Sequence, residues 1–429
     1  MTTEPSRAPP VSDGVVLGVV AAYAAAFVAF GLVVQSPAEA FRGLGAILTT
    51  RDALLTDYFG VGGIGGGCVS AGLLTLAAVL VYWRAGTQMT GAAVACLFLV
   101  LGFGLFGKNL LNVWPIVAGV ALFARFRGEA FRAHLNTAFF GAALAPIFSE
   151  ILFSTTLAPA TGLPLALATG LAVGFILPPA AAHLFRTHGG YSLYNMGFTA
   201  GVVGTLVVAM YKAFSYVPDP VFIWTKGSNG LLSAFLGLVF ASMVALGWGF
   251  DRGVPRRLAI ILKAPGRSPT DFIALAGFGA TLANMGLAGA VGVAYVLATG
   301  GDLNGPSIGA ILTIVGFAAF GKHPRNVAPI MIGVFLGALS RSASPADPSL
   351  TLAALFGTSL APIAGRFGFG WGIAAGFIHA SAALTVGPLH AGLNLYNNGF
   401  AAGIVAAVLV PVILALRAGL GYRDVEAAE

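Results

Sequence analysis

The sequence predicts an all-α polytopic membrane protein built from two inverted-topology repeats of hydrophobic segments, with broken or re-entrant helices. Three observations predict this fold. The 429 residues are 58% hydrophobic and only 9% charged, whereas about 25% of the residues in a soluble domain are charged. Apolar runs of about 20 residues, each long enough to cross a bilayer as a helix, recur along the whole chain. Finally, motifs of the first half return in the second half.

The duplication is visible in four pairs of motifs that occur in the same order. FGKNLLNVWPI at 106–116 agrees with FGKHPRNVAPI at 320–330 at seven of eleven positions. The other pairs are TDYF (56–59) and TDFI (270–273), FGAALAPI (140–147) and FGTSLAPI (356–363), and YNMGFTAGVV (194–203) and YNNGFAAGIV (396–405). The first three pairs lie 214 to 216 residues apart and the fourth 202, because the first half carries extra residues around 149–165.

The repeats divide the chain into a cytoplasmic N-terminal tail (1–13), a first membrane repeat (14–214), a linker (215–228), a second membrane repeat (229–417) and a cytoplasmic C-terminal tail (418–429). Each repeat contains about seven apolar segments. They lie roughly at 14–34, 57–83, 91–107, 109–125, 136–156, 164–185 and 192–213, and at 229–249, 272–299, 306–321, 327–340, 349–364, 370–388 and 392–416. Several segments are short, which is typical of re-entrant pieces that do not cross the whole membrane.

The basic residues of the loops agree with an inverted second repeat. An odd number of crossings in each repeat reverses the orientation of the second. The loop at 250–268 carries five basic residues, whereas its counterpart at 35–56 has balanced charge. The bias reverses later, since 124–134 is basic and its counterpart around SRSASPADPS is balanced. Because lysine and arginine are enriched on the cytoplasmic side, we expect a multi-pass protein of the plasma membrane with both termini cytoplasmic.

The first motif pair places a cation, amides and a proline inside apolar runs. The residues are Lys108, Asn109, Asn112 and Pro115, and in the second half Lys322, His323, Asn326 and Pro329. A proline inside a helix leaves the carbonyl four residues back without a donor, so we expect a break near each Asn-Val-x-Pro. The asparagines either stabilise this kink or bind a polar solute. A lysine at the bilayer centre costs about 2.5 to 3.5 kcal/mol or more, so each lysine either reaches the headgroups from a hairpin tip or lines a solute pathway.

The second motif pair predicts two helix starts that face a solute. Tyr194 and Asn195 correspond to Tyr396 and Asn397, with Asn398 beside them. Asparagine amides both donate and accept hydrogen bonds, and the positive dipole end of a helix attracts anions. The alternative is a capped helix start with a close-packed glycine face.

Two further residues are candidates for coupling transport to an ion. Glu150 is the main acidic residue inside an apolar segment, and Arg366 is its counterpart in the second repeat. Intramembrane carboxylates often mark proton or cation coupling, although Glu150 near the end of its run is equally well placed at the interface. The sequence has neither metal-ligand spacing nor a nucleophile motif, so we predict no catalytic residues, no metal, no cofactor and no enzyme activity.

These features predict a membrane transporter or channel that moves a small polar or anionic solute through a site between the two repeats. The alternative is a structural or regulatory membrane protein without transport activity, which would have a dry, packed midplane at both motifs. The expected partners are the lipid bilayer, the small solute and a second copy in a homo-oligomer. Nucleic acid is not expected, because the basic residues lie between apolar runs and form no continuous face.

The doubled FGK, NVxPI and LYNxGFxAG motifs resemble those of a family of bacterial inner-membrane proteins known as a domain of unknown function. A fainter similarity is to urea transporters, whose inverted halves each carry a Tyr-Asn-x-x-Leu-x-Gly-like element; YNMGFTAG and YNNGFAAG have Phe in place of Leu. This resemblance implies a urea- or amide-type channel as a further alternative. The arrangement of two inverted repeats of seven segments each is also similar to the architecture of nucleobase and anion transporters, which is an analogy of fold alone.

Overall fold

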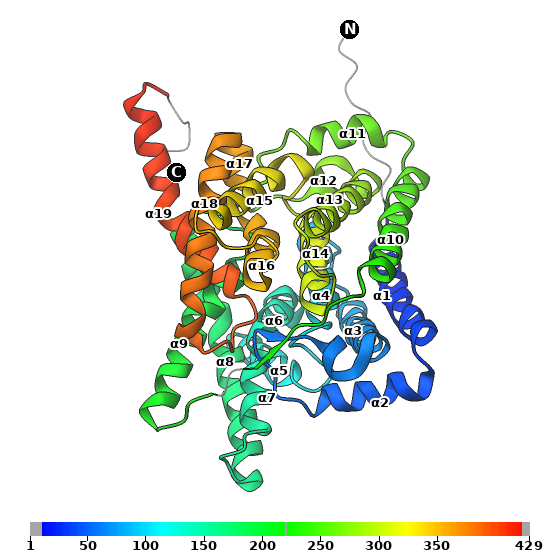
Figure 1. The fold of residues 1–429 in the computed structure, drawn as a ribbon, viewed down its shortest axis with the longest axis vertical. Coiled ribbons are helices and arrows are strands. Elements are labelled where there is room, and N and C mark those ends of the chain that lie inside the picture. The colour runs from blue at the N-terminus through cyan, green and yellow to red at the C-terminus, as the bar shows by residue number, and fades with distance from the viewer. Residues whose placement is uncertain (1–10, 219–220, 423–429) are drawn as a thin grey trace.

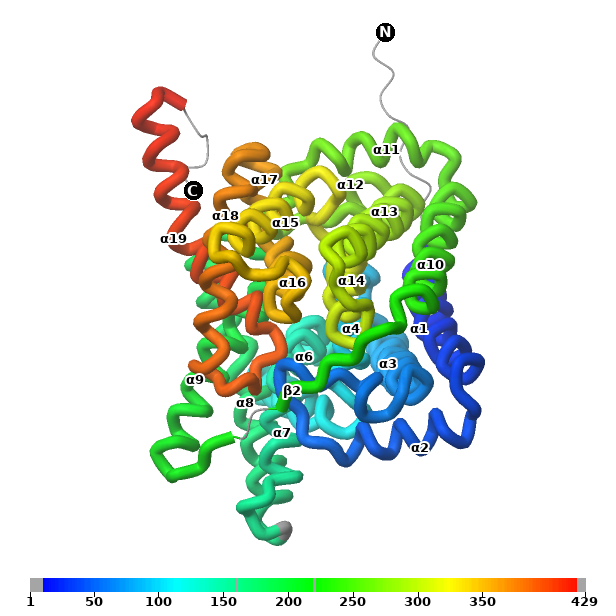
Figure 2. Tube along the Cα trace, in the orientation of Figure 1, coloured from blue at the N-terminus to red at the C-terminus, as the bar shows by residue number. Residues whose placement is uncertain are grey.

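The computed structural model describes residues 11–218 and 221–422, and these residues are almost entirely helical (Figures 1 and 2). Ten helical stretches among them are long and apolar enough to cross a membrane. The prediction of an all-α polytopic membrane protein is therefore confirmed. The predicted tails at 1–13 and 418–429 lie largely outside the described residues.

The two halves contain matching series of helices. The first half consists of α1 (Asp13–Val34), α2 (Pro37–Leu48), α3 (Tyr58–Ala85), α4 (Gly91–Phe103), α5 (Trp114–Arg127), α6 (Leu135–Gly141), α7 (Ala145–Leu152), α8 (Pro159–His188) and α9 (Asn195–Ala213). The second half consists of α10 (Asn229–Phe250), α11 (Val254–Ile261), α12 (Phe272–Ala276), α13 (Phe278–Ala298), α14 (Gly305–Phe317), α15 (Pro324–Leu339), α16 (Pro348–Gly357), α17 (Ala361–Phe367), α18 (Phe369–Val386) and α19 (Asn397–Gly419). Helix α3 corresponds to α12 and α13 together, and the other helices correspond one to one.

Short pieces join these helices. They are the 3₁₀ turns η1 (Phe131–His134), η2 (Ala142–Leu144), η3 (Thr358–Leu360) and η4 (Gly387–His390), and the strands β1 (Leu55–Thr56) and β2 (Phe222–Ile223). The two strands pair in parallel, which ties the segment before α3 to the segment between the two repeats. The predicted linker at 215–228 is therefore held against the first repeat.

The second repeat is inverted relative to the first. Figure 1 shows α2 and α11 lying across opposite ends of the molecule, although they occupy the same place in their repeats. We expected a loop over 35–56, but a helix forms there because Ser36 and Glu39 make a reciprocal capping box. The buried residues of α2 are spaced three and four apart, so one face packs against the protein and the other is open to the membrane surface.

Both repeats bend their third helix at a glycine in the same conformation. Gly63 inside α3 has φ 75° and ψ 167°, and Gly277 between α12 and α13 has φ 83° and ψ 159°. This backbone region is essentially restricted to glycine. The Gln35 side chain accepts a hydrogen bond from the Gly65 amide at 2.9 Å and so satisfies a donor next to the first bend.

Two carboxylates lock the repeats to each other in a reciprocal way. Asp57 caps α3 and also accepts a hydrogen bond from the Gly305 amide at the start of α14, at 3.1 Å. Asp271 caps α12 and accepts from the Gly91 amide at the start of α4, at 2.9 Å. Each pair of corresponding residues is 214 positions apart in the sequence. The repeats are therefore interlocked, with each one capping the central helix of the other.

The central helices α4 and α14 lie side by side and antiparallel in the middle of the molecule (Figure 2). Gly91 at the start of α4 faces Ala319 just past the end of α14, while Gly309 near the start of α14 faces Gly102 near the end of α4. Nearly every residue of both helices is buried. A helix that is apolar all round belongs in a protein core, so these two helices are surrounded by protein and do not face lipid.

The helices α4 and α5 form a re-entrant hairpin, as predicted for the short segments. Each is about 20 Å long, too short to cross a hydrocarbon layer of roughly 30 Å. Arg84 at the end of α3 and Arg132 after α5 line one surface hollow, so the hairpin begins and ends on the same face. In the second repeat, α14 and α15 occupy the corresponding positions.

The helix breaks lie near each Asn-Val-x-Pro, as predicted, but not at the prolines themselves. Pro115 is the second residue of α5, and Pro329 lies inside α15, whose helix continues through it. The chain instead breaks upstream, over 104–113 and 318–323. Proline is tolerated in the first turn of a helix, where its missing N–H would have had no partner. Pro115 in the first repeat and Pro324 in the second therefore mark helices that restart after a break.

The two bend glycines give a stability test. Gly63→Ala and Gly277→Ala should each lower the free energy of unfolding by about 1 to 3 kcal/mol, because alanine disfavours this backbone region. The loss should be greater for Gly63→Ala, since its new Cβ would lie 2.6 Å from the Gln35 side-chain oxygen. Thermal unfolding of detergent-purified variants measures the effect.

The matched control is Gly45→Ala on α2, where a Cβ meets nothing within 4 Å. That variant should be unchanged or more stable by up to about 1 kcal/mol, since alanine favours a helix more than glycine does. Melting temperatures of Gly63→Ala and Gly277→Ala equal to that of the wild type would refute the role of the two bends.

Candidate functional site

Lys108 lies at the tip of the α4–α5 hairpin and is fully buried inside the protein. Its Nζ donates to the Tyr396 hydroxyl at 2.6 Å and to the Phe139 carbonyl at 3.0 Å. The ammonium also lies 4.9 Å from the centroid of the Tyr396 ring and 5.5 Å from that of Phe103. These contacts replace water around a cation that would otherwise be costly to bury.

Lys322 has the same environment in the second repeat. It is fully buried, and its Nζ donates to the Tyr194 hydroxyl and, at 2.7 Å, to the Thr358 hydroxyl. The rings of Tyr194 and Phe317 lie 4.4 and 5.4 Å from the ammonium. Phe317 is the counterpart of Phe103, so the aromatic contacts are also duplicated.

The two pairs cross from one repeat to the other. Lys108 of the first half binds Tyr396 of the second, and Lys322 of the second half binds Tyr194 of the first. Neither ammonium forms an ion pair with a carboxylate within the described part of the chain. Each lysine therefore depends on one neutral oxygen and one ring of its own repeat and on one tyrosine of the opposite repeat, and this contact fixes where the two tyrosines lie.

The asparagines at the starts of α9 and α19 hold neighbouring helices. Asn195 donates to the Ala181 carbonyl of α8 at 3.1 Å and accepts from His188 at 3.0 Å. Asn397 makes the equivalent contacts with Ala383 of α18 and His390, at 2.9 and 3.0 Å. Asn398 accepts a hydrogen bond from His379 at 3.1 Å. These amide groups therefore orient the two helix starts.

The starts of α9 and α19 touch each other. A Cβ on either Gly197 or Gly399 would lie 2.9 Å from the Cα of the other residue, so only glycine allows this crossing. From there the two helices run toward opposite ends of the molecule (Figure 1). Their positive dipole ends consequently meet in the interior.

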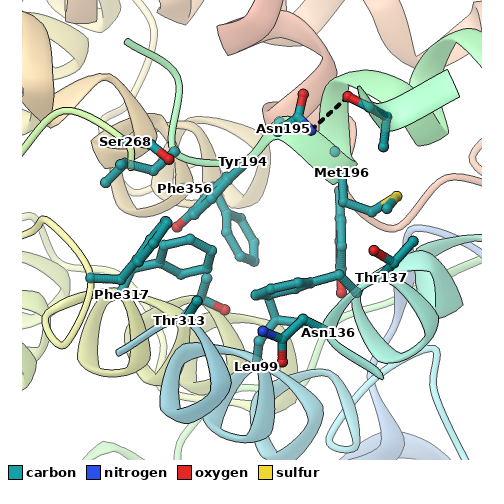
Figure 3. A pocket seen from close by; sticks show the side chains of 18 of the residues that line it. Leu99, Asn136, Thr137, Tyr194, Asn195, Met196, Ser268, Thr313, Phe317 and Phe356 are labelled. Atoms are coloured by element: carbon teal, nitrogen blue, oxygen red, sulfur yellow. Dashed lines mark hydrogen bonds between the residues drawn. The ribbon is translucent and has the colours of Figure 1, made fainter. Parts of the chain in front are cut away.

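A cavity of about 220 Å³ lies at this meeting point (Figure 3). Its wall is mainly aromatic and aliphatic. The polar side chains that line it are Asn136, Thr137, Tyr194, Asn195, Ser268, Thr313, Tyr396 and Asn398. Both tyrosines held by the lysines belong to this wall, as do Phe103 and Phe317, whose rings lie beside the ammonium groups. The cavity therefore lies where the duplicated elements of both repeats converge.

The predicted site residues fall into two groups. Tyr194, Asn195, Tyr396 and Asn398 line the cavity. The others lie outside its wall: Lys108, Asn109, Asn112, Pro115, Lys322, His323, Asn326, Pro329 and Asn397. The second group supports the first, because the lysines position the tyrosines and the asparagines close the turns from which the lysines project.

The asparagines of the first motif stabilise the hairpin turn. The Asn112 amide donates to the Gly107 carbonyl at 3.0 Å, and the Asn109 and Asn112 side chains each accept from the backbone amide of the other. In the second repeat, Asn326 donates to the Gly321 carbonyl at 2.9 Å and, with His323, forms the cap of α15. These amides thus satisfy backbone groups at the break, as one of the two sequence interpretations expected.

The two candidate coupling residues lie in different environments. Glu150 is buried, its carboxylate lies 3.7 Å from the Arg51 guanidinium, and it accepts a hydrogen bond from the Tyr216 hydroxyl at 3.2 Å. Arg366 is exposed and lines a surface hollow with Lys263 and Arg267. No group of three or more metal-ligating side chains occurs among the described residues.

Sequence reasoning missed a buried carboxylate, Asp52, in the loop between α2 and α3. It accepts hydrogen bonds from Tyr58, Asn109, Asn112 and Ser149, at 2.8 to 3.3 Å. Asp52 is fully buried although it lies between helices and not in an apolar run. No signal in the sequence marked it, because its counterpart in the second repeat is Gly266 and the residue is therefore not part of any repeated motif.

Comparison with known proteins gives one match. The family model described as "Protein of unknown function (DUF1576)" matches residues 36–213 and 251–415. The two matched stretches fall in the two halves of the duplicated chain. Neither the curated proteins nor the solved structures contain a match.

The crossed lysine–tyrosine pairs predict a specific coupling of mutations. Tyr194→Phe and Tyr396→Phe should each destabilise the protein by about 1 to 3 kcal/mol, since each leaves a buried ammonium short of an acceptor. Lys322→Met combined with Tyr194→Phe should cost less than the sum of the single changes, and the unfolding free energies of this double-mutant cycle measure the coupling.

Tyr295→Phe is the control, because the Tyr295 hydroxyl makes no hydrogen bond within the described residues. It should change stability by no more than about 0.5 kcal/mol. Strict additivity of the lysine and tyrosine substitutions would contradict the pairing.

Proposed function

The chain belongs to this family of unknown function, and we propose that it is a membrane transporter or channel that moves a small polar solute through the cavity between its two repeats. The observation that carries the proposal is the position of this cavity. It lies where the first turns of α9 and α19 meet and where both repeats contribute the same residue types. Solute sites of transporters with inverted repeats commonly lie at the interface of the repeats.

The lining suggests the chemical class of the solute. No lining side chain is charged among the described residues, and aromatic rings make up much of the wall. A small, flat molecule with a few hydrogen-bonding groups would contact the rings with its faces and the amides and hydroxyls with its edges. The two helix starts make the cavity electrically positive, so a weak anion of the same shape also fits.

The cavity supports transport over a purely structural role. A structural membrane protein would have a tightly packed midplane, whereas the central helices here leave a space of about 220 Å³. The prediction that the chain is not an enzyme stays a prediction, as does a homo-oligomeric state. A urea- or amide-type channel is one member of the proposed class, because urea is small, flat and polar.

The orientation in the membrane follows from the loop charges. The Met89 amide donates to Asp13 at the start of α1, at 2.8 Å. The neighbouring α4 start is tied to Asp271 beside α11, so α1 starts on the α11 face of the molecule. Helix α19 ends on that face as well (Figure 1). The basic loops at 124–134 and 250–268 lie there too, and we propose that this face is cytoplasmic in a bacterial inner membrane.

Ligand screening and flux together test the proposal. The purified protein would be heated with urea, acetamide, uracil or formate, and a rise in the melting temperature would identify a bound solute. Uptake of the same four compounds into proteoliposomes would then show transport. Lack of both stabilisation and uptake with all four compounds would contradict the proposed solute class.

A cavity-filling variant makes a sharper prediction. Thr137→Trp places a large ring in the cavity, so uptake should fall by at least about tenfold while the protein still folds, since a loss of about 1.4 kcal/mol in binding is tenfold. Leu206→Trp on the exposed face of α9 is the control of similar bulk. Equal uptake by both variants would show that the solute does not use this cavity.

A further inference from the structure

The loop between α2 and α3 holds the clearest departure from the twofold repetition. In the second repeat, Gly266 stands at the position of Asp52 and Gly365 at that of Ser149. Phe272 replaces Tyr58 and His323 replaces Asn109; only Asn112 is kept, as Asn326. The first repeat has therefore assembled a buried carboxylate with its own set of donors, whereas the second repeat has no carboxylate there and keeps only one of the donors.

The donors converge on the Asp52 carboxylate from three separate segments. The Tyr58 hydroxyl of α3 donates to Oδ1 at 2.8 Å. The Ser149 hydroxyl of α7 donates to Oδ2 at 2.8 Å, and the amides of Asn109 and Asn112 in the hairpin turn donate at 3.3 and 3.0 Å. Such a set stabilises a buried anion, and all of its members are neutral. In its ionised form the carboxylate therefore holds its charge in the interior with no cation bonded to it in the described part of the chain.

The charged groups around this cluster have other partners. Arg51 and Glu150 face each other at 3.7 Å beside the cluster, and about a quarter of the Arg51 side chain is exposed. Lys108 directs its ammonium toward Tyr396 and Phe139. Burial raises the pKa of Asp52 to about 7, and the hydrogen bonds from Tyr58, Ser149 and Asn112 limit the rise. The residue thus changes charge within the physiological range.

We propose that Asp52 is a proton-binding site, one per chain, whose protonation state controls the turn that supports the cavity. The link to solute movement rests on the function proposed above, whereas proton binding itself does not. The α2 face, on which about a quarter of the Arg51 side chain is exposed, is the side from which water would supply the proton. A proton from that water adds to the carboxylate, and the charge of the site changes from −1 to 0.

Protonation changes the hydrogen bonds in a defined way. The new acid proton needs an acceptor, and an amide N–H cannot become one, whereas a hydroxyl can rotate and accept. Ser149 or Tyr58 therefore reverses its hydrogen bond. With the negative charge gone, the amides of Asn109 and Asn112 also hold Asp52 less strongly, because hydrogen bonds to a charged acceptor are stronger than those to a neutral one.

The hairpin turn carries this change to the cavity. Asn109 follows Lys108 directly, and Asn112 also binds the Gly107 carbonyl on the other side of the lysine. Lys108 in turn holds the Tyr396 hydroxyl, and Tyr396 lines the cavity. A looser turn shifts Lys108 and with it Tyr396. The proton on Asp52 therefore changes the shape of the cavity wall through the contacts of Asp52 with the asparagines, of Asn112 with Gly107, and of Lys108 with Tyr396.

Infrared spectroscopy of the reconstituted protein tests the proton site without any solute. The wild type should show a protonated carboxyl C=O band that disappears with a midpoint near pH 7. Asp52→Asn should lack this band. Ser149→Ala should keep the band and move its midpoint upward by about one pH unit, because the carboxylate loses one donor.

Glu150→Gln is the matched control, since it removes the other buried carboxylate beside the cluster. The band should persist in Glu150→Gln. Loss of the band in that variant, or its persistence in Asp52→Asn, overturns the assignment. If Asp52→Asn does not fold, an unchanged midpoint of the band in Ser149→Ala overturns the assignment instead.

Uptake assays test the link to the cavity. Proteoliposomes would be given urea, acetamide, uracil or formate at pH 6 and at pH 8, with equal pH on both sides. Wild-type uptake should differ by up to about tenfold, because the protonated fraction of a group with a pKa near 7 falls from about nine-tenths to about one-tenth over this range. Asp52→Asn should show the same uptake at both pH values.

If wild-type uptake is the same at both pH values although the infrared band titrates, the link between Asp52 and the cavity is wrong, and the proton site remains. Absence of uptake of all four compounds would instead count against the proposed function, and the infrared titration would still decide whether Asp52 binds the proton.

Discussion

Burial of two lysines in a membrane protein is the constraint on which the rest of the structure depends. An ammonium in this environment requires acceptors that neither lipid nor its own hairpin provides. Lys108 and Lys322 each obtain one acceptor elsewhere in their own repeat and one from the opposite repeat, through Tyr396 and Tyr194. The two halves therefore cannot separate without exposing two buried cations, and the tyrosines are held where the halves meet. Both tyrosines line the cavity, so the crossed arrangement fixes part of its wall.

The same crossing explains why the helices break. The central helices α4 and α14 end before they have crossed the membrane, and each break provides the turn from which a lysine projects. Backbone groups freed by a break must be satisfied inside the protein. Asn112 and Asn326 do this in both repeats, by binding the carbonyls of Gly107 and Gly321. The residues that support the turn, Asn112 and Asn326, are thus separate from those that line the cavity, such as Phe103 and Phe317, although they lie close to them in the sequence.

Departures from the repetition show where the two sides of the molecule differ. The α2 side carries the buried carboxylates Asp52 and Glu150, while the corresponding positions on the α11 side are Gly266 and Arg366. A perfectly symmetric pathway would have no means of distinguishing the two faces of the membrane. An acidic cluster in one repeat supplies such a difference, at a site connected by hydrogen bonds to the hairpin turn beneath the cavity.

Hydropathy, repeated motifs and loop charges are local properties of the chain, and they were sufficient to predict the membrane class, the duplication and the inversion. The sequence also identified both lysines and both tyrosines, since residues kept in both halves stand out. The pairing of each lysine with a tyrosine of the other half could not be predicted, because nothing local specifies a contact between positions 108 and 396. Asp52 escaped notice for a related reason, since its burial comes from α3, α7 and the hairpin folding around a loop.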